Sequence, residues 1–272
     1  TAAVEADLGE IGVRAAAAAV ASARGKERPE GAVRWEWRNT VCSGSARRGK
    51  WAAGMTKNPT EFGCLYGIGV GRGEPELMIL EALKALQKAP VICVPQAANR
   101  RDSYALTIVK DYVKPEQEIL RASFPTDDAE GAAQVWREAS EMVAEKLRKG
   151  QDVAFLTEGD PMLFSTFSYV LAGVQELCPE APVVIIPGVS SVMAAAASSG
   201  VPLVTHGQRL AILPAAYGLD DLSEATSNFD TVVLMKVSPN IVKTLADLEE
   251  LGLTGQSTYV RRVSTEDRKS VV

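Results

Sequence analysis

The alternation of short apolar runs with amphipathic segments, from residue 64 onward, constrains the fold of this chain more than any other feature. CLYGIGV at 64–70 and VICV at 91–94 are short, continuous apolar runs, which is typical of buried strands. The segments at 75–89 and 131–149 place apolar residues on one stripe and are long enough for helices. Strands and helices in alternation predict an α/β fold.

The first 60 residues differ in kind from the rest of the chain. They hold an Ala-rich tract and then a stretch with neither steady periodicity nor a strand-turn rhythm, so we expect 1–60 to be an extension outside the fold, with a native start at Met55. A polar link at 179–182, with a proline at each end, precedes a new strand and predicts a domain boundary. The expected α/β domains are therefore 61–180 and 181–272.

The composition disfavours several classes of function. The 272 residues are 46% hydrophobic and 23% charged, with a net charge of -5, as in a soluble globular protein. The acidic balance disfavours nucleic acid as a partner, and no apolar run approaches the ~20 residues of a membrane span. The four cysteines form no C-x-x-C pair, so we expect no metal site and no disulfide framework, and a reducing cytoplasm fits best.

The stretch GIGVGRGEPE at 67–76 places four glycines at alternating positions after the first strand. The dinucleotide motif fits in neither frame, since its last glycine would fall on Arg72 or Glu74, and no P-loop Gly-Lys-Ser/Thr occurs. Glu74 and Glu76 flank Pro75 at the start of the next helix, where their charges would repel a phosphate. The loop favours close backbone approach to an uncharged or cationic ligand, with a tight turn that binds nothing as the alternative.

Four motifs stand at the carboxyl ends of the expected strands, the edge where open α/β sheets bind ligands. They are GIGVGRGEP at 67–75, TEGDP at 157–161, PGVSS at 187–191 and LMKV at 234–237. Each motif alone has a plain structural explanation as a turn or a helix cap. In this order and spacing they resemble the tetrapyrrole (precorrin) methylase family, from about Leu65 to the C-terminus.

This resemblance implies two α/β domains with a cofactor cleft between them, a homodimer, and S-adenosylmethionine as the cofactor. The runs EGDPMLFSTFSY at 158–169 and PGVSSVMAAAASSGVPL at 187–203 are most similar to the members that methylate C-20 of precorrin-2 or cobalt-factor II in cobalamin biosynthesis. By resemblance, the residues of the cofactor shell are Gly71, Arg72, Glu158, Gly159, Asp160, Leu163, Ser190, Ser191, Met235 and Val263.

The chain departs from the family pattern at two places. Arg72 and Glu74 stand in Gly-Arg-Gly-Glu, where the family usually has Gly-Pro-Gly-Asp. The family also continues beyond the strand at which this chain stops, at 269–272, so we expect the second domain to be truncated.

Roles within the expected site differ in how far the residues support them. Asp160 sits in a Gly-Asp-Pro turn, so we expect it to hold backbone amides and to fix the cofactor rather than to exchange protons. Methylation of a meso carbon is followed by loss of its proton, and the candidate bases, none singled out by spacing, are Asp102, Tyr104, Glu158 and His206. The carboxylates of the substrate have candidate partners in Arg100, Arg101 and Lys236, although a solvated face explains the arginine pair equally well.

Three alternatives stay open on the sequence alone. Another corrin or uroporphyrinogen-III C-methyltransferase would share the same motifs. A nucleotide-binding oxidoreductase or a non-catalytic α/β binding module would belong to another class, and the failed glycine spacing argues against the oxidoreductase. The sequence leaves open whether the tetrapyrrole is metal-free or holds cobalt.

Overall fold

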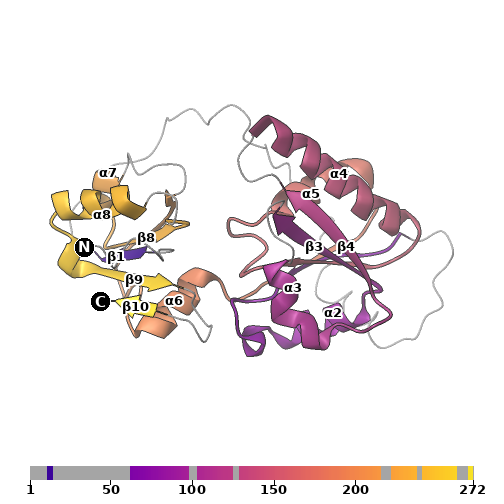
Figure 1. Cartoon of the computed structure of the whole chain (residues 1–272), viewed down its shortest axis with the longest axis horizontal. Helices are drawn as coiled ribbons and strands as arrows, with labels where there is room; N and C mark the ends of the chain where they lie inside the picture. Colours follow the sequence, from indigo (N-terminus) through magenta and orange to yellow (C-terminus); the bar gives the residue numbers. More distant parts are fainter. Residues whose placement is uncertain are drawn as a thin grey trace. The chain divides into compact units, whose positions relative to one another are not determined.

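The computed structural model of the chain describes residues 11–14, 62–97, 103–124, 129–215, 222–237, 241–261 and 269–271. It forms two compact units, of which one ends at Ser190 and the other begins at Ser191 (Figure 1). The second unit also includes the N-terminal strand β1 (Ile11–Arg14). Each unit combines a β-sheet with helices, which confirms the expected α/β class.

A five-stranded sheet forms the centre of the unit that ends at Ser190. Its order across the sheet is β4-β3-β5-β2-β6, and every neighbouring pair is parallel. Strands β2 and β5 are buried at every position, as expected for the middle of a sheet that is covered on both faces. In chain order the strands are β2 (Leu65–Gly69), β3 (Val91–Ala97), β4 (Glu118–Phe124), β5 (Val153–Thr157) and β6 (Val183–Ile186).

Two helices cover each face of this sheet (Figure 1). Successive residues of a strand point to opposite faces, so Phe155 packs with one pair of helices and its neighbour Leu156 with the other. The helices on the Leu156 face are α2 (Leu80–Lys88) and α3 (Tyr104–Val109), and those on the Phe155 face are α4 (Ala129–Arg148) and α5 (Phe167–Leu177). Short 3-10 turns at Pro75–Leu77 and Lys110–Tyr112 precede α2 and follow α3.

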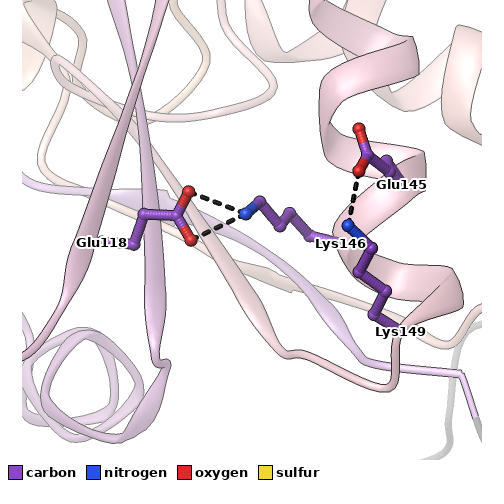
Figure 2. A network of polar contacts seen from close by, with 4 residues as sticks. All are labelled: Glu118, Glu145, Lys146 and Lys149. Carbon is purple, nitrogen blue, oxygen red and sulfur yellow. Dashed lines mark hydrogen bonds and ion pairs between the residues drawn. The ribbon is translucent and has the colours of Figure 1, made fainter.

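An ion pair fixes the C-terminal part of α4 to the edge strand β4. Figure 2 shows Lys146 reaching from the helix to Glu118, and its Nζ lies 2.7 Å from both carboxylate oxygens. The Lys146 side chain is only 18% exposed, so this contact is better shielded from water than the neighbouring pair between Glu145 and Lys149, which runs along the helix surface. The hydrogen bond from Lys149 and the positive charge of Lys149 lower the pKa of Glu145.

The second unit is built on a mixed sheet of order β10-β9-β1-β8-β7. Strands β7 and β8 are parallel, while β1 is antiparallel to both β8 and β9, and β10 is antiparallel to β9. Its elements are α6 (Ser191–Ser199), β7 (Leu210–Pro214), α7 (Leu222–Asn228), β8 (Thr231–Met235), α8 (Ile241–Glu250), the 3-10 turn Thr254–Gln256, β9 (Ser257–Arg261) and β10 (Lys269–Val271).

Two of the expected domain limits differ from the structure. The sequence predicts that the strand at 183–186 opens the second domain, whereas it pairs with Leu65–Ile68 and completes the first sheet, so the division falls at Ser190. The stretch assigned to an extension contains Ile11–Arg14, which pairs with a strand on each side. Four residues are too few to show in the sequence the alternation of apolar and polar residues that identifies a strand. The other residues of 1–60 lie outside the described part of the chain.

Candidate cofactor site at the carboxyl edge of the parallel sheet

The loops after β2 and β5 leave neighbouring strands toward opposite faces of the sheet. Strand β2 leads to α2 on one face, and β5 leads to α5 on the other. At such a switch point, the carboxyl edge of an open α/β sheet forms its ligand crevice. An isolated bridge joins the two loops here, with the N–H of Gly159 donating to the carbonyl of Gly71 at 2.8 Å. The glycine loop and the EGDP motif therefore lie side by side at this edge.

Close backbone contacts among glycines set the shape of this site. Gly71 has φ 75°, in the left-handed region that favours glycine. A Cβ atom at Gly188, in the loop after β6, would lie 2.1 Å from the carbonyl oxygen of Gly159. A Cβ atom at Gly69 would lie 2.5 Å from the same oxygen. Three strand-end loops thus touch at the level of the main chain.

The prediction from sequence did not include Gly69 and Gly188 among the site residues. Both lie inside motifs that the sequence singles out, the glycine loop and PGVSS. Their contacts join residues more than 20 positions apart in the chain. The alternation of glycines was therefore the only sequence signal that could have identified Gly69 and Gly188 as site residues.

The Asp160 carboxylate connects two of these loops. Its Oδ1 accepts a hydrogen bond from the backbone N–H of Met162 at 2.8 Å, which closes a turn within its own loop. Its Oδ2 accepts one from the N–H of Gly188 at 3.0 Å, across to the loop after β6. The aspartate therefore holds backbone amides as the sequence predicts, while its contact with a cofactor stays a prediction.

Arg72 and Glu158 meet across the switch point as an ion pair. Their side chains are 26% and 40% exposed, so solvent screens the attraction, and the pair orients the loops more than it stabilises the unit. The segments 70–76 and 157–163 together hold four carboxylates and one guanidinium. The resulting negative charge favours a cationic ligand and disfavours a phosphate.

The remaining predicted residues are distributed over both units. Leu163 is partly buried and Ser190 buried at the same sheet edge, in the loops after β5 and β6. Ser191 begins α6 in the other unit, where Met235 ends β8, and both side chains are buried. Exposed Lys236 follows Met235 with φ 58°. Three predicted residues lie outside the described part of the chain: Arg100, Arg101 and Val263.

Among the described residues, no candidate base is singled out by its position. Tyr104 is partly buried at the start of α3, and His206 is exposed in a turn. Glu158 is the ion-pair partner of Arg72, and Asp102 lies outside the described residues.

The arrangement suits a sulfonium cofactor such as S-adenosylmethionine. The glycines carry no side chains, so a ligand such as an adenosyl group could approach the main chain of these three loops closely. The excess of carboxylates matches the positive sulfur and would repel a dinucleotide. Within the described ranges, no group of three or more His, Cys, Asp or Glu could hold a metal ion, and no helix is long and apolar enough to cross a membrane.

Several curated relatives are C(20)-methyltransferases of precorrin-2 or cobalt-precorrin-2. The chain is 38% identical over 216 residues to a probable cobalt-precorrin-2 C(20)-methyltransferase of Methanocaldococcus jannaschii, covering 76% of this chain and 86% of that protein. It is 35% identical over 193 residues to the cobalt-precorrin-2 C(20)-methyltransferase of Salmonella typhimurium, covering 70% and 80%. A precorrin-2 C(20)-methyltransferase of Sinorhizobium is 30% identical over 209 residues, covering 74% and 84%.

Solved structures share the fold. A cobalt precorrin-4 methyltransferase matches with a TM-score of 0.60 at 23% identity, covering 80% of this chain and 87% of that one. A uroporphyrin-III C-methyltransferase from Thermus thermophilus, in complex with S-adenosylhomocysteine, matches with a TM-score of 0.56 at 24% identity, covering 77% and 82%. The model of the tetrapyrrole (corrin/porphyrin) methylases matches residues 64–272, and the chain belongs to this family.

Proposed function

We propose that this protein is an S-adenosylmethionine-dependent methyltransferase that methylates C-20 of precorrin-2, in its cobalt-containing or metal-free form, in cobalamin biosynthesis. The observation that carries the proposal is the 38% identity to the Methanocaldococcus jannaschii relative over 86% of its length. The two relatives named for the cobalt substrate are 35% and 38% identical, against 30% for the relative named for precorrin-2. Cobalt-precorrin-2 is therefore the first substrate to test.

The cofactor would supply a methyl group already activated by the positive sulfur. Glu158 and Asp160 provide negative charge beside the glycine loop, which supports the binding of this cation. Asp160 and the glycine contacts hold three loops together, so they would fix the cofactor with little loss of entropy on binding. Ser190, Ser191, Leu163, Met235 and Val263 complete the proposed cofactor shell by the family resemblance.

Methyl transfer to an electron-rich carbon needs alignment of donor and acceptor more than covalent help from the protein. A rigid site contributes by holding the two reactants at attack distance and by excluding water. Proton loss from the methylated carbon needs a base or a bound water. The candidates remain open.

The substrate has several carboxylates at its periphery, and cationic side chains would pair with them. Arg100, Arg101 and Lys236 are the proposed partners. A homodimer and a cytoplasmic location are part of the same proposal, and light scattering after gel filtration would test the dimer.

The proposal is tested by incubating the purified protein with labelled S-adenosylmethionine and, separately, cobalt-precorrin-2, precorrin-2 and uroporphyrinogen III. We expect one label per molecule of the first or second tetrapyrrole, located at C-20 by NMR. Label in uroporphyrinogen III alone would favour the other C-methyltransferase. A thermal shift with NADH and none with S-adenosylmethionine would favour the nucleotide-binding oxidoreductase.

A further inference from the structure

The backbone of Phe164 has an unusual conformation for an aromatic residue. Phe164 and Lys236 are the two non-glycine residues with positive φ in the described part of the chain, and the φ of Phe164 is 48°. In this region the Cβ atom crowds the following carbonyl oxygen, so glycine or asparagine is the usual occupant. A phenylalanine here needs surrounding structure that imposes the bend.

Hydrogen bonds hold the loop on both sides of Phe164. Before it, the Asp160 carboxylate accepts the N–H of Met162 at 2.8 Å. After it, the hydroxyl of Ser165 lies 2.8 Å from that of Thr157 at the end of β5, and it also accepts the N–H of Phe167 at 3.1 Å. The loop is anchored to the sheet edge and to the first turn of α5, and the positive φ of Phe164 lies between these anchors.

The loop presents apolar side chains to solvent. Phe164 is 41% exposed and Met162 is 43% exposed, although both follow Asp160 within four residues. A non-glycine residue in this backbone region lowers stability, and such residues gather at functional sites. A turn with no further role would be better served by glycine at position 164.

We propose that Phe164 contacts the substrate, with its ring packed against the flat, apolar face of the tetrapyrrole macrocycle and Met162 extending the same apolar surface. This inference rests on the proposed function. A conjugated ring system offers the broad face that aromatic side chains prefer in offset stacking. The peripheral carboxylates of the substrate would meet cationic groups elsewhere, so an apolar platform is the complementary requirement.

The test measures steady-state kinetics with cobalt-precorrin-2, and the affinity for S-adenosylmethionine, for wild type and four variants. Phe164→Gly keeps the bend and removes the ring, and Phe164→Ala removes the ring without relieving the bend. Phe164→Tyr keeps the ring. Leu80→Ala is the matched control, because Leu80 is an apolar side chain in the same unit that is 74% exposed.

We expect KM for the tetrapyrrole to rise about tenfold in Phe164→Gly and Phe164→Ala, which corresponds to about 1.4 kcal/mol. An apolar contact made equally before and during methyl transfer changes KM and leaves kcat within about twofold. Leu80→Ala should match the wild type, Phe164→Tyr should raise KM far less than Phe164→Ala does, and all variants should keep their affinity for S-adenosylmethionine.

Two outcomes overturn the inference while the proposed function stands. One is an active wild type whose KM is unchanged in Phe164→Gly. The other is a change of oligomeric state in Phe164→Gly without a change in KM, which would make the ring a subunit contact. A wild type that binds S-adenosylmethionine but methylates neither precorrin-2 nor its cobalt form would overturn the proposed function, and this inference with it.

Discussion

Two substitutions of Asp160 distinguish the contributions of its two hydrogen bonds to stability and to cofactor affinity. Its Oδ1 accepts the N–H of Met162 and its Oδ2 accepts the N–H of Gly188. Asp160→Asn keeps one acceptor oxygen but turns an NH₂ group toward the other N–H, so one bond is lost. Asp160→Ala loses both. A hydrogen bond to a charged group contributes about 1.5–3 kcal/mol, and the lower value applies here because the carboxylate is partly exposed.

The free energy of unfolding should therefore fall by about 1.5 kcal/mol in Asp160→Asn and about 3 kcal/mol in Asp160→Ala. For a unit of this size, these losses correspond to Tm decreases of about 3–6 °C and 6–12 °C. The affinity for S-adenosylmethionine should fall in the same order, since both bonds hold loops of the proposed cofactor site. Circular dichroism melts and calorimetric titration measure the two quantities, with Asp111→Asn, at an exposed aspartate in the same unit, as the control.

Equal Tm values for Asp160→Asn and Asp160→Ala would refute this reasoning, because the two bonds would then not act separately. A different result would reassign the residue. If Asp160→Asn binds S-adenosylmethionine normally but transfers no methyl group, and the wild-type rate follows the ionisation of one carboxylate, Asp160 is the base.

Three further predictions concern packing, an ion pair and a thiol. Gly188→Ala should lower Tm by several degrees or prevent folding, because its Cβ would lie 2.1 Å from a carbonyl oxygen. The control Gly255→Ala should leave Tm nearly unchanged, because a Cβ at this position would have no atom within 4 Å. Equal Tm values for the two variants would contradict the close contact at Gly188. Lys146→Met breaks the ion pair with Glu118, so it should lower the free energy of unfolding by about 0.5–1 kcal/mol at low salt and by less in 1 M NaCl. Urea unfolding measures both values. A loss that does not depend on salt would instead indicate that the lysine stabilises the protein through side-chain packing. Burial raises the pKa of Cys93 to about 12, so its thiol should resist alkylation at pH 8, as measured by peptide mapping. The free energy of unfolding should decline as the pH rises above 9.0, the pKa of the thiol in the unfolded chain, toward 12. Rapid labelling of Cys93 in the folded protein would contradict its burial.

The fold could be predicted from sequence wherever strands are buried on both faces. The runs that form β2, β5 and β8 are continuous and apolar, and each appears at its expected place. Strand β4 was not anticipated, because it lies at the sheet edge and mixes Glu118 and Arg121 with apolar residues. The assignment of β6 to a domain depends on pairing with a strand more than 100 residues earlier, which no local pattern reveals.

The candidate site could be located from its motifs but not assembled from them. The strand-end position of the EGDP motif, together with the turn chemistry of aspartate, led to the prediction that Asp160 holds backbone amides. The partner Gly188 and the pairing of Arg72 with Glu158 depend on which strands are neighbours, so they became visible only in three dimensions. The cofactor and substrate contacts remain predictions.

The central position of β2 affects how the newly made chain folds. This strand is the first of its sheet to be synthesised, yet it lies between β5 and β6. The backbone N–H of Cys64, just before the strand, donates to Asp152, which is synthesised 88 residues later. Until then both edges of β2 are open on the ribosome, where they could pair with other nascent chains. Contacts so distant in sequence also slow folding. Soluble yield should therefore depend on slow synthesis or chaperones, and a chain released before residue 183 would lack the last of the three loops that meet at Gly159.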